Sequence, residues 1–169
     1  HIVLLTLHHI IADGWSMGIV AQEIAERYSG ATPAAAEVQY ADFSVWQREW
    51  MAGPVLQRQL AYWKDRLAGA PPLLQLPTDR PRPAQQTFKG RNVDRLLPRP
   101  LLETLRAFCH QEDATLFMVT LSVFTLLLNR YTGQEDLCVG SPIANRTRRE
   151  LESLIGFFVN TLVLRVDVG

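Results

Sequence analysis

Residues 8–14 read His8-His9-Ile10-Ile11-Ala12-Asp13-Gly14, and they follow directly on an apolar run at residues 2–7. The fixed positions of this motif are two histidines, an aspartate and a glycine, a combination that average residue usage makes improbable by chance. The apolar run predicts a strand buried on both faces, and Asp13-Gly14 predicts a tight turn before a helix. A histidine at the end of such a strand can take up or give a proton near neutral pH. We therefore expect an acyl-transfer site with one of the two histidines at its centre.

The two histidines are adjacent, so on a strand their side chains point to opposite faces. We expect one of His8 and His9 to face a cleft and the other to pack inward, which also makes them a poor pair for one metal ion. Asp13 could orient an imidazole, or pair with a cation and fix the turn. Gly14 would permit the sharp backbone path and leave room for a substrate. Apart from the motif, the same residues also fit two satisfied buried histidines and an ordinary turn.

Charge and composition exclude several classes of protein. The 169 residues carry 17 Lys+Arg and 17 Asp+Glu, for a formal net charge of +0. This balance argues against a dedicated nucleic-acid or membrane-surface binder, which would carry a basic excess. Cys109 and Cys138 are too few and too isolated for a disulfide framework or a metal site, and they fit a reducing, cytoplasmic setting. The longest apolar stretch, residues 116–128, is too short to span a bilayer.

Hydrophobic periodicity predicts a chain of helices and strands in two parts. The helices expected are residues 16–28 with Ser16 as N-cap, 40–50, 56–67, 101–109, 115–130 with a Thr115 cap, and a short helix near 149–154. Further strands are expected near residues 91–97, 136–140 and 157–166. The aromatic residues of 40–50 are expected in the core, and the apolar helix 115–130 must be buried on most sides. A proline-rich, semi-rigid linker at 71–86 separates residues 1–70 from 87–169, which predicts an α/β architecture.

Five segments resemble, in the right order, motifs of the condensation domains of nonribosomal peptide synthetases. Residues 8–16 are similar to the active-site motif of that family. Residues 40–47 (YADFSVWQ) resemble its Tyr-x-Asp-Phe-Ala-x-Trp segment, with Ser44 where alanine is commoner. Residues 155–162 (IGFFVNTL) resemble its Gly-x-Phe-Val-Asn-Thr segment, and residues 76–81 and 139–146 are also similar to family segments. The resemblance covers essentially the whole chain.

The resemblance implies a chloramphenicol-acetyltransferase-like fold, in which two α/β sandwich lobes meet around a tunnel. This chain would supply the end of the N-terminal lobe and the start of the C-terminal lobe, so the isolated piece is expected to be inactive. The reaction implied is peptide-bond formation between a donor and an acceptor aminoacyl thioester, each on the 4'-phosphopantetheine arm of a carrier protein. The domain itself would bind no cofactor or metal. Its partners would be carrier proteins and the adenylation domain of the same synthetase, with no nucleic acid and no membrane.

The same resemblance implies a role for each motif residue. His9, beside His8 and Gly14 of the same motif, would take the amine proton, or hold the amine and stabilise the charged intermediate. Asp13 would be structural, in a salt bridge with Arg146 across the two lobes, which suits a buried aspartate in need of a bidentate partner. Asn160 would line the tunnel, where an amide can bind a carbonyl or an oxyanion.

Alternative functions within the same fold are an epimerase, an acyltransferase that uses a coenzyme A thioester, and a non-catalytic docking module. The segment Trp15-Ser16 resembles domains that join two L-configured residues, and it favours condensation together with residues 155–161. Docking relatives tend to lose the histidine or the glycine of the motif, and here His8, His9, Asp13 and Gly14 are all present.

Overall fold

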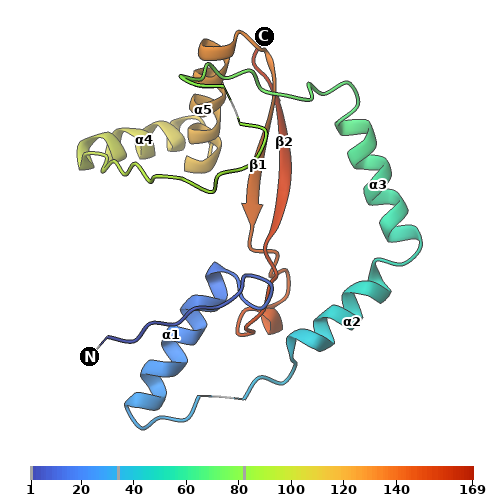
Figure 1. The fold of residues 1–169 in the computed structure, drawn as a ribbon, viewed down its shortest axis with the longest axis vertical. Coiled ribbons are helices and arrows are strands. Elements are labelled where there is room, and N and C mark those ends of the chain that lie inside the picture. Colours follow the sequence, from blue (N-terminus) through green and yellow to red (C-terminus); the bar gives the residue numbers. More distant parts are fainter. Residues whose placement is uncertain (1, 34, 82) are drawn as a thin grey trace. The chain divides into compact units, whose positions relative to one another are not determined.

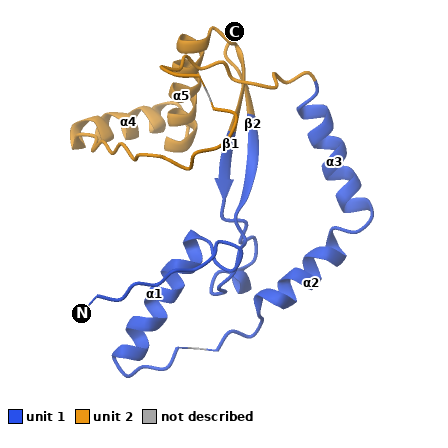
Figure 2. Cartoon of the chain, viewed as in Figure 1, with its two compact units in different colours: residues 1–68, 140–164 blue, residues 69–139, 165–169 orange. Residues whose placement is uncertain are grey.

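A computed structural model describes residues 2–33, 35–81 and 83–169 of the chain (Figure 1). Their contacts divide the chain into two compact units, residues 1–68 with 140–164 and residues 69–139 with 165–169 (Figure 2). The division at the proline-rich linker remains a prediction. In chain order the elements are α1 (Gly14–Tyr28), α2 (Tyr40–Trp50), α3 (Pro54–Arg66), α4 (Arg99–Gln111), α5 (Leu116–Thr132), β1 (Asp136–Ile143), a 3₁₀ helix (Arg149–Leu151) and β2 (Asn160–Asp167).

Helices with clear end signals lie where the sequence predicts them. Helix α2 spans the predicted residues, and the Gln39 backbone N–H donates to Asp42 Oδ2 at 2.8 Å in a capping box. Helix α5 begins after Thr115, whose Oγ1 accepts the Met118 N–H at 3.2 Å, and ends at Gly133 with a φ of 69°. Each of these ends is decided by a neighbour within three residues, which a sequence pattern can identify.

The first helix begins earlier than predicted, and this changes the interpretation of the motif. Asp13, and not Ser16, is the N-cap of α1, because its Oδ1 accepts the Ser16 backbone N–H at 2.9 Å. Asp13-Gly14 is therefore a helix start and not a turn. The turn lies before it, where the Ile11 N–H donates to the His8 carbonyl at 3.1 Å.

Two predicted strands are wrong. Residues 2–7 and 91–97 have no strand conformation, and Ile2 and Val3 are 99% and 84% exposed rather than buried on both faces. In the described part of the chain, β1 pairs with β2. A strand is stable only when its backbone groups form hydrogen bonds with a neighbouring strand. An apolar run without such a neighbour stays extended.

The prediction that the apolar helix at 115–130 is buried on most sides is also wrong. Val119, Thr125 and Leu128 of α5 are buried, whereas Phe117 and Val123 are 55% and 59% exposed. Helix α5 packs mainly against α4, which covers one stripe of it. Within the described residues no single helix is long and apolar enough to cross a membrane, and α4 with α5 would meet that test only as a pair bent by 104°.

Strands β1 and β2 lie side by side as an antiparallel two-stranded sheet (Figure 1). Arg165 donates two hydrogen bonds to Asp136, and a Cβ on Gly140 would lie 3.3 Å from Thr161, so residue numbers rise along β1 as they fall along β2. Both strands overlap the predicted ranges.

The core that positions the site lies where α2 meets residues 151–158. Phe43 of α2 is buried with Leu151, Leu154 and Phe158, and Val38, Tyr40 and Trp46 pack against them. The core role predicted for the aromatic side chains of α2 is confirmed for these residues, while Trp50 is 45% exposed. Because this core holds residues 151–158 in place, it also fixes the loop that contacts the N-terminus of α1.

Candidate active site

The carboxylate of Asp13 is the buried centre of the site and is 3% exposed. Its Oδ1 accepts hydrogen bonds from the backbone N–H and the hydroxyl of Ser16, at 2.9 and 2.8 Å, and from Arg146 Nη2 at 3.2 Å. Its Oδ2 accepts the Phe158 N–H at 3.0 Å. The carboxylate also lies at the positive end of the α1 dipole. Asp13 therefore joins the start of α1 to the loop before β2.

Hydrogen bonds keep Asp13 ionised despite its burial. Burial alone raises the pKa of the carboxyl, but the hydrogen bonds from Ser16 and Phe158 and the charge of Arg146 outweigh it and lower the pKa from 3.8 to about 2. A carboxylate with this pKa is a weak base near neutral pH. Asp13 is thus suited to holding the backbone and unsuited to taking a proton from a substrate.

Arg146 completes this arrangement, and its side chain is 2% exposed. Nη1 donates to the carbonyls of Leu151 and, at 2.8 Å, Leu154, while Nη2 donates to Asp13. The guanidinium carbon lies 4.2 Å from the centroid of the Phe158 ring, a cation–π contact. One arginine thus binds the helix cap, the aromatic core and two carbonyls of the loop, and the ion pair with Asp13 lies within one compact unit.

The hydroxyl of Ser16 links the same two segments and is fully buried. Ser16 Oγ lies 2.8 Å from both Asp13 Oδ1 and the Gly156 carbonyl, and it accepts the N–H groups of Gly156 and Arg146 at 3.0 Å. A hydroxyl has one proton, so Asp13 and the Gly156 carbonyl share it. The sequence predicted Ser16 as an N-cap, and its connection to Gly156 was missed because 140 residues separate the two.

Gly156 is the point of closest approach between the loop and α2. A Cβ at this position would lie 2.3 Å from Cδ2 of Tyr40 and 2.8 Å from the Phe158 ring, which leaves no room for a side chain. The Gly156 carbonyl also accepts the Asp13 N–H at 3.1 Å. The glycine in the Gly-x-Phe segment is therefore explained by packing of the loop against Tyr40 and by its bonds to α1.

His9 lies at the exposed side of this arrangement, and its imidazole is held at one nitrogen. Nδ1 lies 2.8 Å from the Ala12 carbonyl, and because a carbonyl only accepts, Nδ1 carries the proton of this hydrogen bond. In the neutral imidazole Nε2 is then unprotonated. The ring also contacts Phe157 edge-to-face, with centroids 5.1 Å apart. The geometry leaves Nε2 as the nitrogen able to accept a proton.

The other predicted site residues are more loosely placed. His8 is exposed and its Nδ1 accepts the Ile10 N–H at 3.1 Å, so the expectation that one histidine packs inward is wrong: both lie on the turn and not on a strand. Gly14 has no positive φ and nothing lies near its Cβ position, so a sharp turn does not require it. Asn160 begins β2, where its Oδ1 accepts the Thr161 N–H at 2.8 Å and its amide N–H groups remain available as donors.

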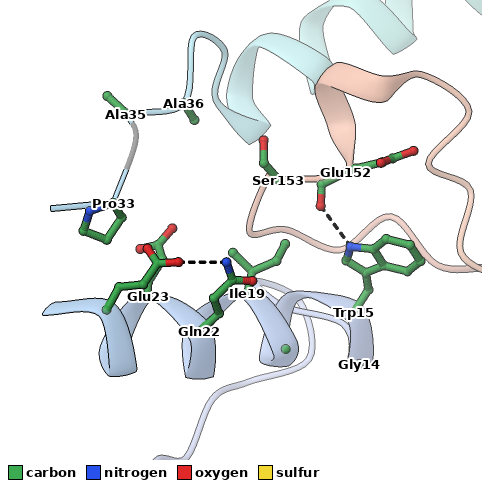
Figure 3. Close-up of a pocket in the computed structure, with 12 residues that line it drawn as sticks. Gly14, Trp15, Ile19, Gln22, Glu23, Pro33, Ala35, Ala36, Glu152 and Ser153 are labelled. Atoms are coloured by element: carbon green, nitrogen blue, oxygen red, sulfur yellow. Dashed lines mark hydrogen bonds between the residues drawn. The ribbon is translucent and has the colours of Figure 1, made fainter. Parts of the chain in front are cut away.

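Gly14 opens onto a hollow of about 800 Å³ along one side of α1 (Figure 3). Trp15 lines it and donates its indole N–H to the Glu152 carbonyl at 2.9 Å, which adds another link between α1 and the loop. Glu23 of α1 and Ser153 lie on its walls. Among the described residues, no group of three or more His, Cys, Asp and Glu side chains is arranged to hold a metal ion.

Comparisons of the chain with known proteins agree on one protein family. A family model described as "Condensation domain" matches residues 1–169. One of the proteins that make up the linear gramicidin synthase of Brevibacillus parabrevis is 52% identical over 175 residues, which are 100% of this chain and 2% of that protein. The chain thus spans a small part of the length of this relative.

Two solved structures share the arrangement of helices and strands. One is holo-AB3403, a four-domain nonribosomal peptide synthetase bound to AMP and glycine, with a TM-score of 0.87 and 27% identity over 96% of this chain and 12% of that one. The other is the X-domain in complex with OxyB from teicoplanin biosynthesis, with a TM-score of 0.83 and 27% identity over 95% of this chain and 38% of that one. These likenesses confirm the predicted α/β, chloramphenicol-acetyltransferase-like fold.

Proposed function

The chain belongs to the condensation-domain family, and on that premise we propose that it forms peptide bonds in nonribosomal peptide biosynthesis as part of a longer synthetase. The substrates are a donor aminoacyl or peptidyl thioester and an acceptor aminoacyl thioester, each on the phosphopantetheine arm of a carrier protein. Support comes from the whole-chain match to the family and from the likeness to a linear gramicidin synthase.

The observation that carries this proposal is the way His9 is held. The Ala12 carbonyl holds the proton of Nδ1, so in the neutral imidazole Nε2 is the nitrogen without a proton; the residue is exposed and its ring contacts Phe157. A neutral imidazole nitrogen is a suitable general base near neutral pH. His9 Nε2 can therefore receive the proton of an attacking amine or accept a hydrogen bond that orients it.

The reaction needs one proton transfer and no external oxidant or reductant. The acceptor amine nitrogen attacks the donor carbonyl carbon, a C–N bond forms, and the C–S bond of the donor thioester breaks. The proton lost by the amine passes to His9 Nε2 and then to the departing thiolate, which leaves as the thiol of the donor carrier. The amide N–H groups of Asn160 would stabilise the carbonyl oxygen as it gains negative charge.

Asp13 and Arg146 support this chemistry without taking part in proton transfer. With a pKa of about 2, Asp13 stays charged, and it is saturated by donors from Ser16, Phe158 and Arg146. Its role in the proposal is to fix the helix start after the His9 turn. His8 and Gly14 take supporting roles in the turn and at the start of α1.

The proposal extends to partners and subtype. A carrier protein is required for each substrate, and an adenylation domain of the same synthetase would load the acceptor. Trp15 and Ser16, both bonded to residues 152–156, are the segment that resembles domains joining L-configured residues. Cys109 and Cys138 are free thiols, which supports a reducing, cytoplasmic setting.

The test is single-turnover peptide formation in the synthetase that carries this chain, with its flanking carrier proteins loaded. Product on the acceptor carrier is followed by intact mass for the wild type and for His9→Ala. We expect dipeptide in the wild type and a fall of at least about a hundredfold in the variant. His8→Ala is the matched comparison on the neighbouring residue, and we expect it to lose much less activity.

Two other outcomes would redirect the proposal. Equal rates for the wild type and His9→Ala would reduce His9 to a packing residue. Loaded carriers that bind without any product, in the wild type as well as the variant, would favour a docking module. One of the similar structures, the X-domain, is in complex with another protein, OxyB, which is the observation that favours this second function.

A further inference from the structure

Phe157 lies on the loop before β2, and its ring is in contact with the imidazole of His9. The two ring centroids are 5.1 Å apart and the ring planes meet at 77°, an edge-to-face arrangement. Phe157 is 39% exposed, so its ring shares the open side of the site with His9. The Gly-x-Phe-Val-Asn-Thr pattern leaves position 157 unspecified, so the resemblance gives this residue no role.

We propose that Phe157 is a positioning residue that fixes the imidazole plane of His9, an inference that rests on the proposed function. The hydrogen bond from Nδ1 to the Ala12 carbonyl holds one atom of the ring, but in an exposed side chain one hydrogen bond leaves freedom of rotation about the Cβ–Cγ bond. A second contact is needed to fix the direction of Nε2. Phe157 supplies this second contact from the loop before β2.

The backbone around Phe157 is anchored on three sides, which makes its ring a firm support. The hydroxyl of Tyr40 donates to the Phe157 carbonyl at 2.9 Å. The next residue, Phe158, donates its N–H to Asp13 at 3.0 Å, and the preceding Gly156 donates its N–H to Ser16 Oγ at 3.0 Å.

Through this arrangement the buried residue Asp13 affects the position of the exposed residue His9. Asp13 and Ser16 hold the loop, the loop holds Phe157, and Phe157 holds His9. A catalytic side chain needs such support from its neighbours, because small displacements cost large factors in rate. Phe157 acts through His9 and needs no contact with the substrate itself.

The first arm of the test measures turnover in the complete synthetase with loaded carriers. We expect Phe157→Leu to lower the single-turnover rate about tenfold at saturating carrier, with little change in the carrier concentration for half-maximal rate. Phe157→Tyr keeps the aromatic ring, so we expect it to retain the wild-type single-turnover rate. Phe108→Leu on α4 is the matched control for the same change at another exposed phenylalanine, and it should leave the rate unchanged.

The second arm measures His9 directly and does not depend on turnover. Diethyl pyrocarbonate acylates unprotonated imidazole nitrogens, and fragment masses distinguish His9 from the adjacent His8. We expect Phe157→Leu to speed the labelling of His9, because its imidazole is no longer held in one orientation against the Phe157 ring, while labelling of His8 stays constant and reports an intact turn. Phe157→Tyr should label His9 at the wild-type rate.

The two arms separate this inference from the proposed function. Unchanged labelling of His9 in Phe157→Leu, with peptide formed at the wild-type rate, would overturn the positioning role. Faster labelling of His9 in a protein that forms no peptide even as wild type would support the positioning role and reject condensation. Equal loss of turnover in Phe157→Leu and Phe157→Tyr, with unchanged labelling, would also overturn it.

Discussion

At one end of the motif, His8 and His9 are exposed and their imidazoles are held by the backbone of a single turn. At the other end, four residues after His9, Asp13 is 3% exposed and accepts four hydrogen bonds, one of them from Arg146. The motif thus joins two exposed imidazoles to a buried carboxylate, both of whose oxygens accept hydrogen bonds.

In the proposed function, this difference separates the histidine that would exchange a proton from the aspartate that supports the backbone. A group that exchanges a proton with a substrate must be reachable, and His9 is exposed. A group that fixes the backbone gains from burial, because each of its hydrogen bonds is stronger away from water. The lowered pKa of Asp13 follows from this saturation and excludes it from proton transfer near neutral pH.

The largest effect is expected when the buried end loses its charge. Asp13→Asn keeps the size and the helix-capping ability of the side chain, but it removes the charge and replaces one acceptor oxygen with an amide donor that faces an N–H group such as that of Phe158. Arg146, 2% exposed, would then lack its counter-ion, and we expect a loss of about 3 kcal/mol in the free energy of unfolding. Chemical denaturation of the full chain, followed by tryptophan fluorescence, measures this.

Asp136→Asn is the matched control, because it removes the same charge from a more exposed pair. Arg165 Nη2 lies 2.6 Å from Asp136 Oδ2, but these side chains are 23% and 33% exposed. Water can solvate either partner there, so we expect a much smaller loss of stability. Similar losses in Asp13→Asn and Asp136→Asn would contradict the claim that burial makes the Asp13 pair important.

Acid should weaken the buried end in a defined window. The pKa of Asp13 is about 2 in the folded chain against an ordinary 3.8, so the unfolded chain takes up the proton first. The stabilisation is therefore complete above about pH 4 and is lost as the pH falls toward 2, by up to about 2 kcal/mol. Denaturation at a series of pH values should show the stability gap between wild type and Asp13→Asn narrowing over this window. A constant gap would mean that Asp13 has an ordinary pKa.

The sequence predicts the elements whose ends are decided locally. Helix α2 has the predicted bounds, and helix α5 begins directly after the predicted Thr115 cap. The cap of α1 was assigned to Ser16 because serine and aspartate are both good caps and lie three residues apart. The choice between them depends on Gly156, which lies 140 residues away and whose carbonyl accepts a hydrogen bond from the Ser16 hydroxyl.

The features that local sequence patterns do not predict depend on partners that are distant in the sequence. Residues 2–7 have the composition of a buried strand, but a strand forms only where another strand pairs with it. The pairing of Asp13 with Arg146, 133 residues apart, followed from the resemblance and not from any local pattern. The Phe157 contact with His9 has no sequence signal, because its position in the motif is open and only the fold brings the rings together.

The smallest expected effect on stability is at Tyr40, which contacts the loop of residues 156–158. Tyr40→Phe keeps the ring against Phe158 and Gly156 but removes the hydrogen bond to the Phe157 carbonyl. We expect a loss of about 1 kcal/mol or less in unfolding free energy, since the hydroxyl is exposed. Tyr62→Phe on α3 removes an equivalent hydroxyl from an exposed tyrosine and serves as the control. Because the Phe157 carbonyl belongs to the residue that supports His9, turnover should fall in Tyr40→Phe and stay constant in Tyr62→Phe, and equal turnover in both would show that the loop holds Phe157 without this hydroxyl.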